Sequence, residues 1–241
     1  MNYQELLNAS TKLNEQIKLR LNPEGNSEQL SMLPPNIDGL EIDKSMLIFG
    51  INPSSNDLDS GEKRQSVLGY VNLDNPIVKQ FYKKGFTYPV YFKKNYELAP
   101  ENFSMLWEAK GFLENNSKDF KENELEFLLK NRNSTGNYVT FTELAYYKET
   151  SAKKVQPVLE KLKNEVLDLF NMQLAYYNPN IVVITNAFAS RFVNKNLSDG
   201  SRQTEINYMG IPILFSGMAT GQGAMDVYSY YRLQRDVSKF L

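Results

Sequence analysis

Residues 47–55 read LIFGINPSS and change character at the glycine. The residues before Gly50 are large and apolar, and such a short continuous apolar run is typical of a strand buried on both faces of a sheet. After Ile51 come an asparagine, a proline and two serines, which favour a turn or the first residues of a helix. The stretch therefore predicts a buried strand over 46–51 that ends in a small polar turn.

The rest of the chain alternates between strand and helix patterns. Strands are expected over 46–51, 138–147, 181–185 and 210–215. Helices are expected over 2–20, 76–84, 103–115, 119–131, 152–176, 187–195 and 226–240, with Pro157 near the first turn of its helix. This alternation implies right-handed crossovers and a mainly parallel sheet between helical layers. We expect one three-layer α/β/α domain over 1–241 with a central, mainly parallel four-stranded sheet, in which 1–45 form an N-terminal helix and an irregular lead-in.

The composition restricts the chemistry. The 241 residues include no cysteine and no histidine, which excludes disulfides, thiolate metal sites and imidazole bases. Catalysis must therefore use carboxylates, amides, hydroxyls, lysine, arginine or oriented water. Asp57 and Asp59 carry oxygen ligands suited to Mg²⁺, but acids in a turn are more often solvated, so we expect no metal and no cofactor.

No segment approaches the roughly 18 consecutive apolar residues of a membrane span. The N-terminus is amphipathic, without the basic and then apolar pattern of a signal peptide. We expect a cytoplasmic monomer that does not bind membranes. Because the net charge is −1, binding to nucleic acid would need a local basic face.

Four polar segments follow the predicted strands. They are the turn 51–55, the residues around Glu143, Asn186, and the glycine-rich loop 216–225. Since the carboxyl ends of parallel strands meet at one edge of a sheet, these segments are expected to lie together and to form the site. Locally, Asn52 and the serines are also ordinary turn and capping residues, and Glu143 would serve equally well as a solvent-facing residue.

A strand that ends in Gly50-Ile51-Asn52-Pro53 resembles the first active-site motif of the uracil-DNA glycosylase superfamily, most closely that of its mismatch-specific branch. The resemblance covers roughly residues 45–236 at the level of architecture and implies a uracil-DNA glycosylase-like fold. It implies that Asn52 positions the water that attacks the sugar as the base departs. Ile51 would then lie in the base-binding region, and Ser54 and Ser55 would contact phosphate and sugar.

The chain departs from this family at two places. Glu143 takes a position where several branches carry an asparagine that reads the uracil edge, and a carboxylate, which only accepts hydrogen bonds, would instead suit an amino-bearing edge such as that of guanine. The last loop lacks the family's histidine, so the leaving base would be stabilised only weakly, by hydroxyls, an amide or backbone N–H groups. The residues expected to contact the DNA backbone or act as a wedge there are Ser216, Gly217, Met218, Thr220 and Gln222. The same loop can also be read as a tight strand-to-helix turn.

The segment 79–94 interleaves lysines with aromatic residues and contains no acid. Such a segment can bind phosphates and stack on an extruded base, although aromatic residues at mixed spacing are more often buried. Tyr70 and Phe81 are the stacking candidates. The leading hypothesis is a DNA glycosylase that flips a damaged or mismatched base. The alternatives are a catalytically silent module that binds nucleic acid or a nucleotide, and an unrelated small-molecule enzyme.

Overall fold

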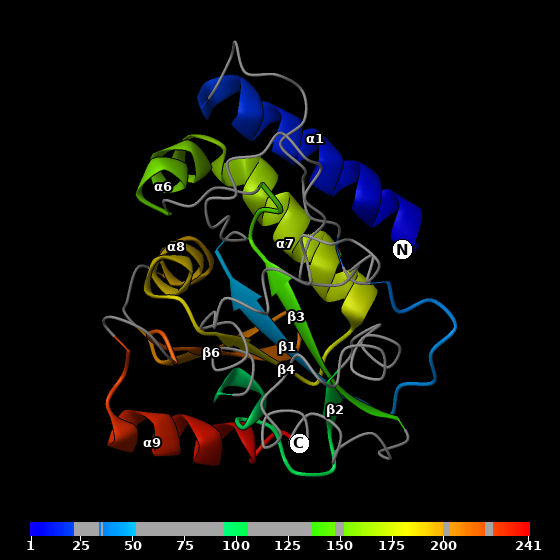
Figure 1. Cartoon of the computed structure of the whole chain (residues 1–241), viewed down its shortest axis with the longest axis vertical. Helices are drawn as coiled ribbons and strands as arrows, with labels where there is room; N and C mark the ends of the chain where they lie inside the picture. Colours follow the sequence, from blue (N-terminus) through cyan, green and yellow to red (C-terminus); the bar gives the residue numbers. More distant parts are fainter. Residues whose placement is uncertain are drawn as a thin grey trace, which may run out of the picture.

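The computed structural model describes residues 1–21, 34, 36–51, 94–105, 136–147, 152–199, 203–219 and 224–241. These residues form an α/β structure with a central sheet, as Figure 1 shows. The strands are β1 (Lys44–Gly50), β2 (Ser104–Met105), β3 (Asn137–Glu143), β4 (Ile181–Ile184), β5 (Glu205–Tyr208) and β6 (Ile211–Phe215). The predicted α/β class and the predominantly parallel sheet are confirmed.

The sheet has the order β2-β3-β1-β4-β6-β5. All neighbouring pairs are parallel except β5 and β6. The four predicted strands correspond to β1, β3, β4 and β6, and the sheet gains two short edge strands that were not predicted. Residues 104–105 therefore belong to a strand rather than to the helix expected from residue 103 onward.

The helices are α1 (Tyr3–Leu21), α6 (Ala152–Lys161), α7 (Lys163–Tyr177), α8 (Ala187–Leu197) and α9 (Val227–Val237). The single helix expected over 152–176 is two helices, because the backbone leaves helical geometry at Leu162 (φ −100°, ψ 29°). Leu162 is buried and continues the apolar stripe, so its periodicity does not reveal the break. Pro157 lies inside α6 rather than in its first turn.

Helices cover both faces of the sheet. Figure 1 shows α6 and α7 on one side of the strands and α9 on the other, with α1 lying against α7. The rings of Phe49 in β1 and Phe170 in α7 lie 4.8 Å apart between centroids, which fixes α7 on the central strand. Within the described part of the chain, no helix is both long and apolar enough to cross a membrane.

Candidate functional site

A row of four residues crosses the carboxyl edge of the sheet. Gly50 and Glu143 end β1 and β3 and are register partners. Thr185 and Ser216 directly follow β4 and β6, and their amides donate to carbonyl oxygens of the neighbouring strands at 3.2 and 3.0 Å, so the ladder continues to them. Residues in register across a parallel sheet project from the same face. We call Glu143, Gly50, Thr185 and Ser216 the edge row.

The edge row faces away from α7. Successive residues of a strand point to opposite faces, and the residues that precede Gly50 and Glu143 both contact α7. Phe49 packs on Phe170, and Thr142 hydrogen-bonds to Gln173. The edge row therefore lies on the face of the sheet that carries α9 (Figure 1).

The side chain of Glu143 lies over the backbone of Gly50. A Cβ atom added to Gly50 would be 2.1 Å from Oε2 of Glu143, so only glycine leaves room for this carboxyl group. Glu143 is 6% exposed, and its Oε2 has no hydrogen-bond partner among the residues described. Burial of an acid without a counter-charge favours the protonated form, and it raises the pKa of Glu143 to about 8.

This protonation state corrects the expectation from sequence. With a pKa of about 8, Glu143 is a neutral carboxylic acid at pH 7, with one O–H donor and one carbonyl acceptor. Glu143 can therefore donate as well as accept hydrogen bonds, so a preference for an amino-bearing base edge no longer follows from its charge. The solvent-facing alternative is also wrong, because the side chain is buried.

Two hydroxyl groups continue the edge row beyond Gly50. Thr185 is 1% exposed, and its Oγ1 has no hydrogen-bond partner among the described residues. Ser216 Oγ lies 3.1 Å from the carbonyl oxygen of Ile184 and 3.0 Å from that of Gly217. Sequence reasoning did not single out Thr185, although its position directly after an apolar strand was a signal for it.

A buried polar network holds the end of β3 from the α7 side. Gln173 Nε2 donates to the carbonyl oxygen of Glu143 at 3.0 Å, and the hydroxyl of Tyr146 donates to Gln173 Oε1 at 2.9 Å. Thr142 Oγ1 contacts both Tyr146 and Gln173. Burial raises the pKa of Tyr146 well above its usual range, so its hydroxyl stays neutral. The network fixes the backbone from which Glu143 extends.

Asn186, expected at this edge, caps α8. Its Oδ1 accepts hydrogen bonds from the amides of Phe188 and Ala189 at 2.9 and 3.1 Å. This is the usual role of asparagine before the first turn of a helix. The amide side chain is therefore committed to the fold.

Some of the other predicted site residues lie within the described ranges of the chain, and the rest lie outside them. Ile51 is buried in the core, while Gly217 and Met218 are half-buried. The amide of Met225 donates to the carbonyl oxygen of Met218 at 2.8 Å, which closes the base of the glycine-rich loop. The predicted residues outside the described ranges are Asn52, Ser54, Ser55, Tyr70, Phe81, Thr220 and Gln222.

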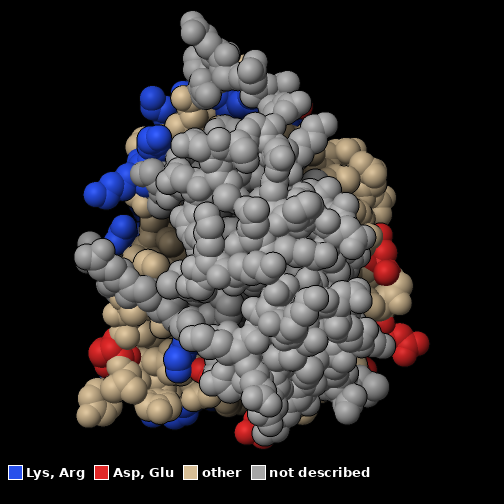
Figure 2. All heavy atoms as spheres, in the orientation of Figure 1, with Lys and Arg blue, Asp and Glu red and all other residues tan. Residues whose placement is uncertain are grey.

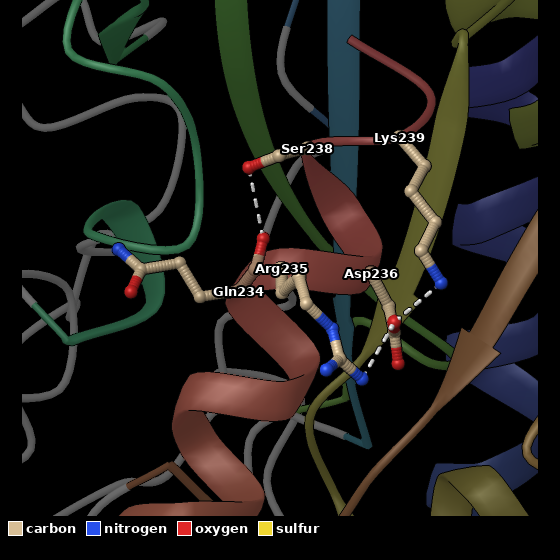
Figure 3. A network of polar contacts seen from close by, with 5 residues as sticks. All are labelled: Gln234, Arg235, Asp236, Ser238 and Lys239. Carbon is tan, nitrogen blue, oxygen red and sulfur yellow. Dashed lines mark hydrogen bonds and ion pairs between the residues drawn. The ribbon is translucent and has the colours of Figure 1, made fainter.

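A separate cavity of about 610 Å³ lies between α9 and the segment 94–101. The two walls are joined by hydrogen bonds from Tyr230 to the Lys94 carbonyl oxygen (2.6 Å) and from Gln234 to the Glu97 carbonyl oxygen (2.7 Å). Figure 3 shows Gln234 directed toward this segment, and Asp236 on another side of α9. Glu97, Glu101 and Lys94 line the cavity, and Lys94 pairs with Glu97 at 3.0 Å, so the lining carries a net negative charge that is unfavourable for phosphate. No edge-row residue contributes to this cavity.

Basic side chains gather beside the carboxyl edge. In Figure 1 the arrows of β1 and β3 point to the upper left, and Figure 2 shows lysine and arginine side chains on that margin. The exposed basic residues of α6, α7 and α8 are Lys153, Lys154, Lys161, Lys163, Arg191 and Lys195. We call these six residues the basic margin; α6 and α7 cover the face of the sheet opposite to the edge row, and Lys195 pairs with Glu160 of α6 at 4.0 Å. Sequence reasoning missed the basic margin because its residues are spread over 43 positions and mixed with acids.

The comparisons with known proteins do not assign the chain to a family. No protein-family model matches the chain, and no curated protein matches it. Among the described residues, no group of three or more acids is arranged to hold a metal ion. The features that bear on function are the edge row, the basic margin and the sequence that follows Gly50.

Proposed function

We propose that this chain is a DNA glycosylase that hydrolyses the N-glycosidic bond of a damaged or mismatched base, on a uracil-DNA glycosylase-like fold. The observation that carries the proposal is the buried carboxyl group of Glu143, whose Oε2 has no hydrogen-bond partner among the described residues and which lies over Gly50, two positions before Asn52 in the sequence. An unsatisfied buried polar atom costs about 1–3 kcal/mol unless a ligand or water satisfies it. Such an atom at the carboxyl edge of a parallel sheet is where a ligand is expected.

The roles of the residues follow from their chemistry. The amide side chain of Asn52 orients the water that attacks the sugar carbon, while Glu143 hydrogen-bonds to the base. Because an enzyme can reach this carbon only after the base leaves the stack, the base is flipped into the site. The basic margin supports the DNA part of the proposal, since lysine and arginine neutralise phosphates without reading sequence.

The reaction is expected to be slow. Asn52 is not a base, the chain contains no histidine, and a positioned general base contributes about 10²–10⁴-fold to a rate. The experiment measures base release from duplexes that carry uracil, hypoxanthine, mismatched thymine or an alkylated base. It compares the wild type with Asn52→Ala and with Asn207→Ala, a control at an exposed position of β5. Release that is lost only in Asn52→Ala supports the proposal, and no release from any duplex at high enzyme and long times refutes it.

A second candidate is a catalytically silent module that binds nucleic acid. The basic margin favours it, because this surface requires no catalytic group. Salt-dependent DNA binding without base release would identify this function. Each phosphate contact contributes about −0.9 to the slope of log K against log salt on duplex DNA. Replacing Lys153 and Arg191 by alanine should therefore flatten the slope, whereas Lys239→Ala, just after the end of α9, should not. Absence of binding at low salt counts against both candidates.

A further inference from the structure

We propose that Glu143 is the general acid of this reaction, which transfers its proton to the departing base. This inference rests on the proposed function and adds a catalytic role beyond base binding. The chain has no imidazole to stabilise the leaving base, and Glu143 is the one ionisable residue of the edge row. In this step the water oxygen bonds to the sugar carbon, the N-glycosidic bond breaks, and its electron pair leaves with the base. The Glu143 proton joins the base, and the proton lost by the water returns through solvent to Glu143.

The geometry around Glu143 keeps its proton in place before reaction. The carboxyl group is buried between the end of β3 and Gly50 of β1, and α7 reaches only the backbone oxygen of Glu143, through Gln173. Within the described residues no ion-pair partner contacts it. Tyr146, a titratable neighbour that interacts with it, is itself held neutral by burial. An acid in these surroundings retains its proton at neutral pH.

The carboxyl group of Glu143 is not committed to the fold by any hydrogen bond of Oε2 among the described residues. Thr185, the next side chain along the edge row, likewise has an unpartnered and buried hydroxyl oxygen. Glu143 Oε2 and Thr185 Oγ1, on either side of Gly50 in the edge row, lack partners among the described residues and can therefore hydrogen-bond to a ligand. We therefore place the leaving base against Glu143, with Thr185 as its neighbouring contact.

A general acid matters most for a poor leaving group. Removing it should slow the release of uracil by about 10²–10⁴-fold. The release of 5-fluorouracil should slow much less, because the fluorine stabilises the departing anion. The test measures single-turnover release of both bases by the wild type, by Glu143→Gln and by Glu205→Gln, a control at an exposed position of β5. Unfolding curves confirm that each variant is folded.

Two readouts separate a general acid from a binding residue. The wild-type rate should fall above about pH 8, because the acid then loses its proton, and this fall should be absent in Glu143→Gln. Equal slowing of uracil and 5-fluorouracil release, or an unchanged pH profile in Glu143→Gln, overturns the inference but leaves the glycosylase proposal standing. No release by the wild type overturns both. Infrared titration of the wild type against Glu143→Gln gives a readout without substrate: a carboxylic acid band lost near pH 8 supports the inference, and a band lost near pH 4.5 overturns it.

Discussion

Replacing Glu143 with glutamine should remove a large pH dependence from the free energy of unfolding. Burial raises the pKa of this carboxyl group from its ordinary value of 4.5 to about 8. Between these two values the folded protein holds a proton that the unfolded chain has released, so stability falls as the pH rises. Over the whole interval the loss is of order 5 kcal/mol, which is comparable with the entire stability of many domains.

The measurement is urea unfolding between pH 5 and pH 9. The difference in unfolding free energy between the wild type and Glu143→Gln isolates this group. Asp226 and Asp236, whose pKa values are lowered by their hydrogen bonds, contribute equally to both proteins and cancel. The control Glu205→Gln, at an exposed position, should keep the wild-type pH dependence.

The shape of the difference curve decides the outcome. The wild type should lose stability relative to Glu143→Gln from about pH 4.5 upward, and the difference should level off above about pH 8, where Glu143 is ionised in both states. A flat difference curve would show that Glu143 ionises with an ordinary pKa. The assignment of a neutral acid at the edge row would then be wrong.

Three further predictions concern the surroundings of the site, each measured by urea unfolding at pH 6. Gly50→Ala should cost about 1–3 kcal/mol, because the new Cβ would lie 2.1 Å from Glu143 Oε2, and much less in a Glu143→Ala background; equal costs in both backgrounds would contradict the contact. Gln173→Leu should cost about 1–3 kcal/mol by leaving buried polar groups unpaired, and a neutral effect would show that the network is not needed. Asn186→Ala should cost about 1 kcal/mol through the lost helix cap, whereas the exposed Asn207→Ala should change stability by less than about 0.5 kcal/mol.

The interior strands were predictable because of their burial. Parallel strands in the middle of a sheet are covered on both faces, so β1, β4 and β6 are encoded as continuous apolar runs. The edge strands lack this signal: Glu205–Tyr208 alternates between exposed and buried positions, and Ser104–Met105 has only two residues. Four of the six strands in the described sheet could therefore be predicted from the sequence.

The site could be predicted only as a set of loops. The rule that strand ends converge placed Glu143 and Ser216 at the same edge, and both lie there. The register between β1 and β3, whose paired residues are 93 positions apart, cannot be read from the sequence of either strand. The sequence therefore gave no sign that Glu143 pairs with Gly50, or that Thr185 continues the same row. Burial and charge state depend on that register, so the sequence alone predicts an ionised carboxylate at Glu143.

The contact between the Glu143 carboxyl group and Gly50 should lower stability while it supports activity. An acid held over Gly50, with no counter-charge among the described residues, destabilises the folded protein above pH 4.5, and a neutral amide of the same shape does not. Glu143→Gln should therefore be the more stable protein at pH 8 and the less active one on uracil. If Glu143 only filled space, replacing it with glutamine would raise stability without loss of activity. If Glu143 is a functional group retained despite its cost to stability, the same change would raise stability and lower activity. Measuring both properties on one preparation tests whether the buried acid is present for chemistry, and a variant that gained stability and kept its full rate would refute that explanation.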